Sequence, residues 1–325
     1  MSFLNDKSIL VTGGTGSFGR KFVRAVLDRT GARRVIVFSR DELKQYEMTQ
    51  QFGPEDRLRY FIGDVRDDER LSRALDGVDA VVHAAALKQV PAAEYNPFEA
   101  VKTNIIGAQN VINACIDRGV QRVVALSTDK ASSPINLYGA TKLVSDKLFI
   151  QGNSYAGGKR TRFAVVRYGN VVGSRGSVVP FFQSRAASGV LPITDERMTR
   201  FWITLNQGVE FVLTSLESMG GGELFVPKIP SMRVTDLAHA IAPGAKLEVV
   251  GIRPGEKLHE EMISVDDARR TLDIGDRYVI QPEFPWWAST HLEGDPVPEG
   301  FAYTSDRNDE WLDIAALREM LGEDV

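Results

Sequence analysis

The stretch of sequence that decides the fold is residues 122–142, which read RVVALSTDKASSPINLYGATK. The mostly apolar run at 122–126 predicts a buried parallel strand. Thr128, Asp129 and Lys130 follow at its carboxyl end, the edge at which open α/β sheets bind ligands. Tyr138 and Lys142 have i, i+4 spacing, so both project from one face of the next helix. We expect these five residues to meet in one crevice and to move protons and a hydride.

A glycine-rich turn follows the first predicted strand, in the stretch KSILVTGGTGSFG at residues 7–19. Glycine permits a tight turn and lets backbone N–H groups approach a pyrophosphate closely. An ordinary βα turn is the alternative, but a second strand at 34–38 follows at the spacing of a dinucleotide-binding unit. Strands and helices alternate through residue 173, which predicts an α/β fold with a Rossmann-type doubly wound parallel sheet.

The rest of the chain predicts a smaller C-terminal substrate lobe. We expect 1–171 and 203–229 to form the NADP-binding domain, and 172–202 and 230–325 to form the substrate-binding lobe. Residues 253–260 are expected to open a helix. After about Asp266 the pattern weakens because prolines interrupt it.

The second predicted strand ends in Ser39 and Arg40, where an NAD site usually carries an acidic residue for the ribose. Arg40, with Lys44 one turn later, favours NADP, unless Arg40 is only a solvated surface charge. Asp64 could accept a bond from adenine or cap the helix that begins near Asp67. The predicted cofactor-binding residues are Gly13, Thr15, Gly16, Ser17, Phe18, Gly19, Ser39, Arg40, Lys44, Asp64, Val65, Ala84, Ala86, Lys88, Thr103, Tyr138 and Lys142.

Composition excludes several classes of partner. The net charge of −4 and the lack of a Lys/Arg run argue against nucleic-acid binding. The single cysteine, Cys115, excludes an internal disulfide framework and fits a reducing compartment. No apolar run reaches the ~18 residues of a membrane span, and the N-terminus lacks the order of a signal peptide. We therefore expect a soluble cytoplasmic protein, with no metal site.

Thr128, Tyr138 and Lys142 match the Ser/Thr and Tyr-x-x-x-Lys set of the short-chain dehydrogenase/reductases, and residues 12–19 resemble their extended branch. The finer resemblance is to the soluble, 5-inverting UDP-N-acetylglucosamine 4,6-dehydratases that open pseudaminic acid synthesis. It is carried by residues 39–44, 127–130, 134–142, 167–177 and 251–260. The 5-retaining dTDP-glucose dehydratases carry Asp-Glu in place of Asp129-Lys130. The large membrane-bound dehydratases carry methionine in place of Tyr138.

The resemblance implies oxidation, elimination and reduction on one bound sugar. Tyr138, as phenolate, would take the proton of the C4 hydroxyl, aided by Lys142 and by a hydrogen bond from Thr128. Lys130 would remove the C5 proton as a neutral amine, which requires a lowered pKa. Asp129 would donate a proton to the departing C6 hydroxyl. A tightly bound NADP would be regenerated, and a water, Lys130 or Tyr138 would return the C5 proton.

Cations and polar groups are expected to hold a UDP-sugar. The candidates are Lys88, Asn170, Arg175, Thr194, Arg200 and Arg253, the arginines because a guanidinium fork suits phosphate oxygens. The helices around 97–118 and 138–155 could pair subunits into a dimer or an assembly of dimers. The rival interpretations are a nucleotide-sugar 4-epimerase or simple dehydrogenase, a non-enzymatic NADP-binding regulator, and an interaction scaffold.

Overall fold

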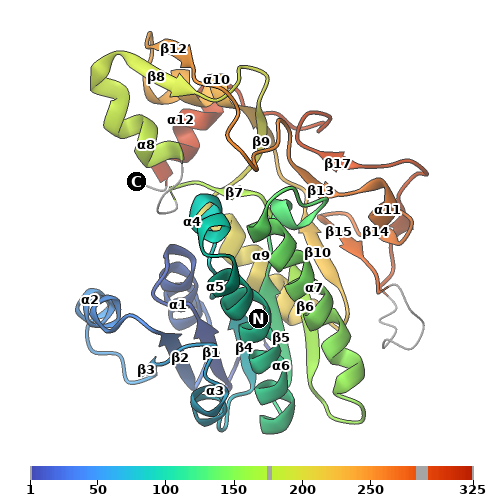
Figure 1. Ribbon diagram of the computed structural model, residues 1–325. Helices are drawn as coiled ribbons and strands as arrows, with labels where there is room; N and C mark the ends of the chain where they lie inside the picture. Colours follow the sequence, from blue (N-terminus) through green and yellow to red (C-terminus); the bar gives the residue numbers. More distant parts are fainter. Residues whose placement is uncertain (1, 174–177, 283–291, 324–325) are drawn as a thin grey trace.

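The structure is a computed structural model and describes residues 2–173, 178–282 and 292–323. Its centre is a ten-stranded sheet in the order β16-β14-β15-β10-β6-β5-β4-β1-β2-β3 (Figure 1). Neighbouring strands from β3 to β10 pair in parallel. These strands are β1 (Ser8–Thr12), β2 (Arg34–Ser39), β3 (Leu58–Ile62), β4 (Ala80–His83), β5 (Arg122–Leu126), β6 (Arg162–Val166) and β10 (Leu224–Pro227). The predicted fold class is confirmed.

Helices cover the sheet in two groups that are packed among themselves. In the first group α1 (Ser17–Arg29) contacts α9 (Leu205–Ser218). In the second group α6 (Gly107–Arg118) packs between α3 (Asp68–Ala74) and α7 (Leu137–Tyr155). The core between these layers is apolar and fully buried, because strands covered on both faces need apolar side chains throughout. Shorter helices are α2 (Glu42–Phe52), α4 (Val90–Tyr95) and α5 (Pro97–Val101).

Strands β15 (Arg277–Ile280), β14 (Thr271–Asp273) and β16 (Asp295–Pro296) extend the sheet beyond β10 in antiparallel fashion. The expected division assigned this part of the chain to the substrate lobe, and the structure instead joins it to the main sheet. The strands are too short, and too often followed by proline, to give a clear sequence pattern.

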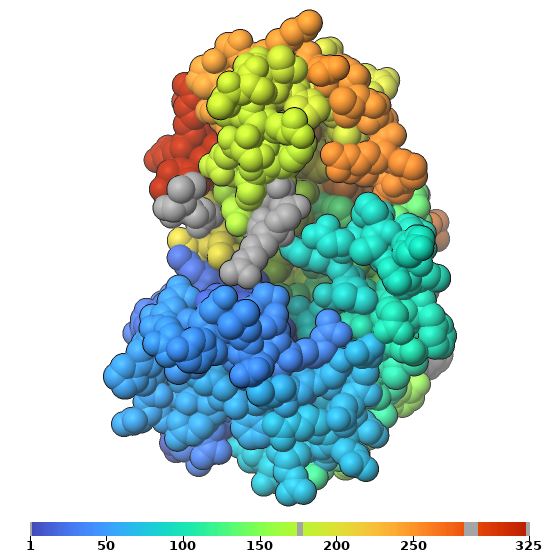
Figure 2. Space-filling view, turned by 60° about the vertical axis from the view of Figure 1, so that its left-hand side comes forward, coloured from blue at the N-terminus to red at the C-terminus, as the bar shows by residue number. Residues whose placement is uncertain are grey.

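The smaller lobe has its own core, formed where α8 (Val178–Arg185), α10 (Val234–Ile241) and α12 (Ile314–Glu323) pack beside paired strands. These strands are β8 (Val190–Ile193) with β12 (Lys246–Val249), and β9 (Thr199–Ile203) with β7 (Asn170–Val171) and β11 (Ser231–Arg233). β13 (Glu261–Ile263) pairs with β17 (Tyr303–Thr304). Figure 2 shows the lobe above the blue N-terminal part, with the surface hollowed between them.

None of the helices in the described part of the chain is long and apolar enough to span a membrane. The described residues also contain no group of three or more His, Cys, Asp or Glu side chains that could hold a metal ion.

Candidate active site

In the glycine-rich turn after β1, the glycines place no side chain over the backbone at the carboxyl edge of the sheet. Gly13 has a φ of +66°, and a Cβ there would come within 2.9 Å of the backbone nitrogen of Ala85. A Cβ at Gly19 would meet Gly14, so α1 can lie close to the turn only with glycine at this position. Gly16 caps α1 without a side-chain bond. The first N–H groups of α1 are therefore open to a phosphate group.

A cavity of about 620 Å³ begins at this turn and follows the carboxyl ends of the strands. Every predicted cofactor-binding residue lines it: Gly13, Thr15, Gly16, Ser17, Phe18, Gly19, Ser39, Arg40, Lys44, Asp64, Val65, Ala84, Ala86, Lys88, Thr103, Tyr138 and Lys142. The Thr103 hydroxyl on this wall is buried and has no hydrogen-bond partner among the described residues. The length of the cavity, its phosphate-ready turn and this unused hydroxyl fit a dinucleotide.

The far end of this cavity holds the residues predicted to distinguish NADP from NAD. Arg40 is 54% exposed, and its guanidinium lies 3.5 Å from Asp64. Asp64 also accepts hydrogen bonds from Arg66, which outweigh burial and lower the pKa of that carboxyl. Asp67, not Asp64, caps α3. The interpretation of Asp64 as a helix cap is therefore wrong. The hydroxyl of Ser39 accepts a hydrogen bond from Gln45.

The turn after β5 places Thr128, Asp129 and Lys130 in one hydrogen-bonded group. The Thr128 hydroxyl donates to Asp129 Oδ1 over 2.8 Å, and Lys130 Nζ donates to the same oxygen over 3.1 Å. Asp129 Oδ2 is buried and has no partner within the described residues. Lys130 Nζ also lies 3.4 Å from Oε1 of Glu260, the residue just before β13.

The expectation that Lys130 has a lowered pKa is wrong. Burial acts in that direction, but the carboxylates of Asp129 and Glu260 outweigh it and raise the pKa of Lys130. The raised pKa favours the ammonium form of Lys130. Its protonation depends on a contact with Glu260, which is remote in sequence.

Tyr138 lies in the first turn of α7, and contacts from several parts of the chain fix this end of the helix. Asn136 caps it by accepting from the Gly139 N–H, and Glu94 of α4 accepts from the Leu137 N–H over 2.7 Å. Burial raises the pKa of Tyr138 to about 12, while the Lys130 charge and a hydrogen bond with Thr128 oppose this rise.

Lys142, one turn further along α7, is buried. Burial lowers the pKa of Lys142, and the buried carboxylate of Asp146 opposes that effect. The Lys130 charge and the Thr128 hydroxyl both lower the pKa of Tyr138.

Asn104 lies in a π-helical turn, Lys102–Ile106, between α5 and α6. Its side chain bonds the backbone N–H and carbonyl of Leu87, and donates to the Thr141 hydroxyl on α7. Asn104 therefore ties the loop after β4 to the helix that carries Tyr138.

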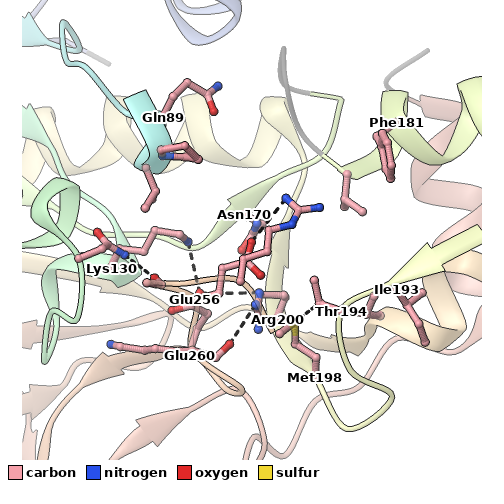
Figure 3. A pocket seen from close by; sticks show the side chains of 18 of the residues that line it. Gln89, Lys130, Asn170, Phe181, Ile193, Thr194, Met198, Arg200, Glu256 and Glu260 are labelled. Carbon is pink, nitrogen blue, oxygen red and sulfur yellow. Dashed lines mark hydrogen bonds and ion pairs between the residues drawn. The ribbon is translucent and has the colours of Figure 1, made fainter. Parts of the chain in front are cut away.

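A second cavity of about 740 Å³ lies between the sheet edge and the smaller lobe (Figure 3). Lys88, Lys130 and Asn170 line both cavities, so the two spaces meet at these residues. The predicted substrate residues that line the second cavity are Lys88, Asn170, Thr194, Arg200 and Arg253. Arg175 lies outside the described residues.

These substrate candidates are not equally available. The guanidinium of Arg200 donates to the backbone carbonyls of Thr199, Lys257 and Leu258 and lies 3.7 Å from Glu260. Arg253 is 62% exposed, and its guanidinium lies 3.7 Å from Glu256. Arg253 is thus better placed for a diphosphate than Arg200, whose charge is already used inside the protein.

Sequence reasoning did not identify Glu260 as a site residue. Residues 253–260 were expected to open a helix, whereas they form turns that lead into β13. These turns bring the Glu260 carboxylate to Lys130. The other cavity-lining residues that were not identified include Gln89, Asn136, Phe181 and Met198.

Comparisons with known proteins identify the family of this chain and its relatives. Residues 9–282 match the model of a family described as polysaccharide biosynthesis protein. This chain belongs to that family. The inverting UDP-N-acetylglucosamine 4,6-dehydratase of Campylobacter jejuni is 55% identical over 98% of each chain. The resemblance stated from the sequence is confirmed.

Other relatives extend the comparison. The UDP-glucose 4-epimerase of Rickettsia canadensis is 41% identical over 85% of this chain and 83% of its own. The structure of Pen from Bacillus thuringiensis has a TM-score of 0.90 and 36% identity, covering 99% of both chains. DesIV, a dTDP-glucose 4,6-dehydratase from Streptomyces venezuelae solved with NAD and TYD bound, has a TM-score of 0.68 and 26% identity over 77% of this chain and 86% of its own.

Proposed function

We propose that this protein is a UDP-N-acetylglucosamine 4,6-dehydratase that inverts C5 and yields UDP-2-acetamido-2,6-dideoxy-beta-L-arabino-hex-4-ulose. The observation that carries the proposal is the bonded pair of Asp129 and Lys130, which lies beside Tyr138 where the two cavities meet. An epimerase or a simple dehydrogenase needs Tyr138 and Lys142 but has no task for an acid–amine pair. The 55% identical relative supports the same assignment.

NADP is the proposed cofactor, held by the glycine-rich turn and by Arg40 and Lys44 at the ribose end of the first cavity. When bound, it supplies the acceptor of a hydride from C4 and the donor of a hydride to C6, and it leaves each turnover unchanged. A guanidinium and an ammonium suit a 2′-phosphate better than a ribose hydroxyl.

Tyr138 starts the reaction by taking the proton of the C4 hydroxyl. Its phenolate is disfavoured by burial, so it depends on the Lys130 charge and on the Thr128 hydroxyl. These two groups belong to the turn after β5, and they favour the phenolate form of Tyr138 that takes the C4 hydroxyl proton.

Elimination then needs a base for the C5 proton and an acid for the C6 hydroxyl. Lys130 starts as an ammonium ion, but it can pass a proton to Asp129 across their 3.1 Å hydrogen bond. This transfer makes both groups neutral, an amine that can take the C5 proton and an acid that can donate to the leaving oxygen. Because an ammonium ion is a much weaker acid than a carboxylic acid, the transfer requires that substrate binding bring the pKa values of the two groups closer together. Inversion requires that the returning proton reach C5 from the face opposite Lys130.

Incubation with UDP-N-acetylglucosamine in deuterated water, followed by NMR of the product, tests the proposal. A 6-deoxy-4-keto sugar with deuterium at an inverted C5 is expected. A sugar that keeps its C6 hydroxyl and changes only at C4 would identify a 4-epimerase. Tight NADP binding without turnover of any UDP-sugar would identify a regulator.

The cellular setting belongs to the same proposal: a cytoplasmic enzyme of pseudaminic acid synthesis that works as a homo-oligomer. Large apolar side chains are exposed on α5, the π-helical turn and α7, where subunits would pair; they are Phe98, Ile106, Val144 and Tyr155. Light scattering of the purified protein should therefore give a dimer or a multiple of it.

A further inference from the structure

Glu260 is a buried carboxylate that the segment before β13 brings to the turn after β5, which carries Asp129 and Lys130 and is called the catalytic turn below. Only 2% of the residue is exposed. Two bonds to Ser305 fix its backbone: the Glu260 N–H donates to Ser305 Oγ over 2.9 Å, and the Ser305 N–H donates to the Glu260 carbonyl over 2.8 Å. The side chain therefore leaves a rigid position just before β13.

The carboxylate of Glu260 faces two cations. Its Oε1 lies 3.4 Å from Lys130 Nζ and 3.7 Å from Arg200 Nε, as Figure 3 shows at one side of the second cavity. Its Oε2 is buried without a partner among the described residues. Asp129 approaches the same Nζ from the turn itself. The Lys130 ammonium is thus held between two carboxylates, one from its own turn and one from the segment before β13.

The next residue, Glu261, contacts the same turn without touching Lys130. Its Oε1 accepts from the hydroxyls of Ser132, at 2.7 Å, and Ser133, at 2.6 Å. Glu260 and Glu261 are therefore two neighbouring carboxylates that contact one catalytic turn, and only Glu260 reaches the group that moves protons.

We propose that Glu260 is a positioning residue of the reaction, which acts through Lys130 by holding the proton that Lys130 shares with Asp129. This inference rests on the proposed dehydratase function. Glu260 keeps the Lys130 amine charged until substrate binds, and it fixes Nζ beside Asp129 so that the proton can move between them. The proton passes from Nζ to Oδ1 and leaves with the C6 hydroxyl as water, and Nζ regains a proton from C5.

The sign of the effect follows from the charges around Lys130. Asp129 and Glu260 favour the ammonium, while Arg200, and Lys88 at the junction of the cavities, oppose it; Tyr138 faces it as a neutral phenol. Removal of one carboxylate leaves the ammonium less favoured. The Asp129–Lys130 pair then loses its shared proton at a lower pH than in the wild type. The decline of activity at alkaline pH should therefore begin at a lower pH in the variant.

The test compares pH profiles of kcat/KM for the wild-type enzyme, Glu260→Gln and Glu261→Gln, after the wild-type product has been identified. We expect Glu260→Gln to move the alkaline limb down by about 1–3 pH units, the usual effect of one nearby charge. Glu261→Gln is the matched control and should keep the wild-type limb. Glu260→Asp keeps the charge at a longer distance, so its limb should lie between those of Glu260→Gln and the wild type.

The outcomes separate the two claims. If wild-type protein makes no 6-deoxy-4-keto sugar, the proposed function fails before any variant is compared. If wild-type protein is a dehydratase and both Glu260 variants lose activity equally at every pH, Glu260 has only a structural role and the inference is overturned. If Glu260→Gln does not fold, an unshifted limb in a folded Glu260→Asp that binds NADP also overturns it.

Discussion

Gly139 lies directly against the carbonyl oxygen of Lys130, so closely that a Cβ at position 139 would collide with that oxygen. The contact joins the first turn of α7, which carries Tyr138, to the turn that carries the acid–amine pair. The two catalytic groups of the proposed reaction are therefore spaced by backbone packing, and not by their side chains alone.

Gly139→Ala should consequently separate Tyr138 from Lys130. The added methyl group must push α7 away from the turn, and a displacement of this kind near reacting groups lowers kcat by about 100-fold. Overpacking should also lower the free energy of unfolding by roughly 1–3 kcal/mol. Steady-state kinetics and urea unfolding measure both effects.

Gly208→Ala is the control for this prediction. Gly208 also lies in a helix, α9, but a Cβ there would meet nothing within 4 Å. The change should leave kcat intact and stabilise the helix by roughly 0.5–1 kcal/mol. A Gly139→Ala enzyme as active as Gly208→Ala would show that the contact does not set the spacing.

Arg40→Ala should weaken NADP binding much more than NAD binding. A charge-assisted hydrogen bond to a 2′-phosphate contributes about 1.5–3 kcal/mol, which corresponds to roughly a 10- to 150-fold loss of affinity for NADP. Calorimetric titration of both dinucleotides measures the ratio. Arg73→Ala, an exposed change on α3 away from the cavities, is the control. Equal losses for NADP and NAD would contradict a role for Arg40 in selecting NADP.

The parts of the site that sequence alone predicted are those fixed by local chemistry. The glycine turn needs small residues next to each other in the chain, and Tyr138 and Lys142 share a helix face by spacing alone. The contacts that sequence alone did not reveal join distant segments. Glu260, which is 130 residues away in the sequence, raises the pKa of Lys130, and the bonds of Arg200 to carbonyls at 257 and 258 depend on a turn.

At the cofactor end of the cavity, too, the sequence predicted which residues lie together but not how their side chains pair. The strand ends brought Ser39, Arg40 and Asp64 to one edge, because parallel strands end on the same side. The contact of Asp64 with Arg66 and Arg40 was not visible, since it depends on side-chain directions in a turn.

His83 should make the protein less stable in mild acid. The Thr12 hydroxyl accepts from the N–H groups of Ala84 and Ala85, so its own hydrogen points to Nδ1 of His83, 2.9 Å away. Burial, with a smaller effect of the Lys142 charge, lowers the pKa of His83 to about 3. Below pH 6.5 His83 binds a proton in the unfolded chain but not in the folded protein. The free energy of unfolding therefore falls as the pH falls towards 3.

The expected size is about 1.4 kcal/mol per pH unit, or about 2 kcal/mol between pH 6.5 and pH 5. Urea unfolding at pH 7 and pH 5 measures it. His83→Asn keeps an acceptor near Thr12 but cannot titrate, so its unfolding free energy should depend less on pH than that of the wild type. The same pH dependence in both proteins would show that His83 does not cause it.

Tyr138→Phe and Lys130→Met should stop the reaction at different points. Without the phenol no proton leaves the C4 hydroxyl, so Tyr138→Phe should form neither product nor reduced cofactor. Lys130→Met keeps the phenol but has no base for C5, so it should reduce bound cofactor and form no 6-deoxy sugar. Each change should lower the rate of product formation by about 10²- to 10⁴-fold.

The loss of Lys130 should also affect the first step of the reaction. Lys130 also lowers the pKa of Tyr138, so its loss should slow the reduction of cofactor, and a higher pH should restore that step by forming more phenolate. Lys159→Met, which changes an amine held by Asp117 away from both cavities, is the control. Absorbance of the reduced cofactor during a single turnover, followed across pH, measures the first step separately from product release. If Lys130→Met formed the 6-deoxy sugar at the wild-type rate, Lys130 would not be the base.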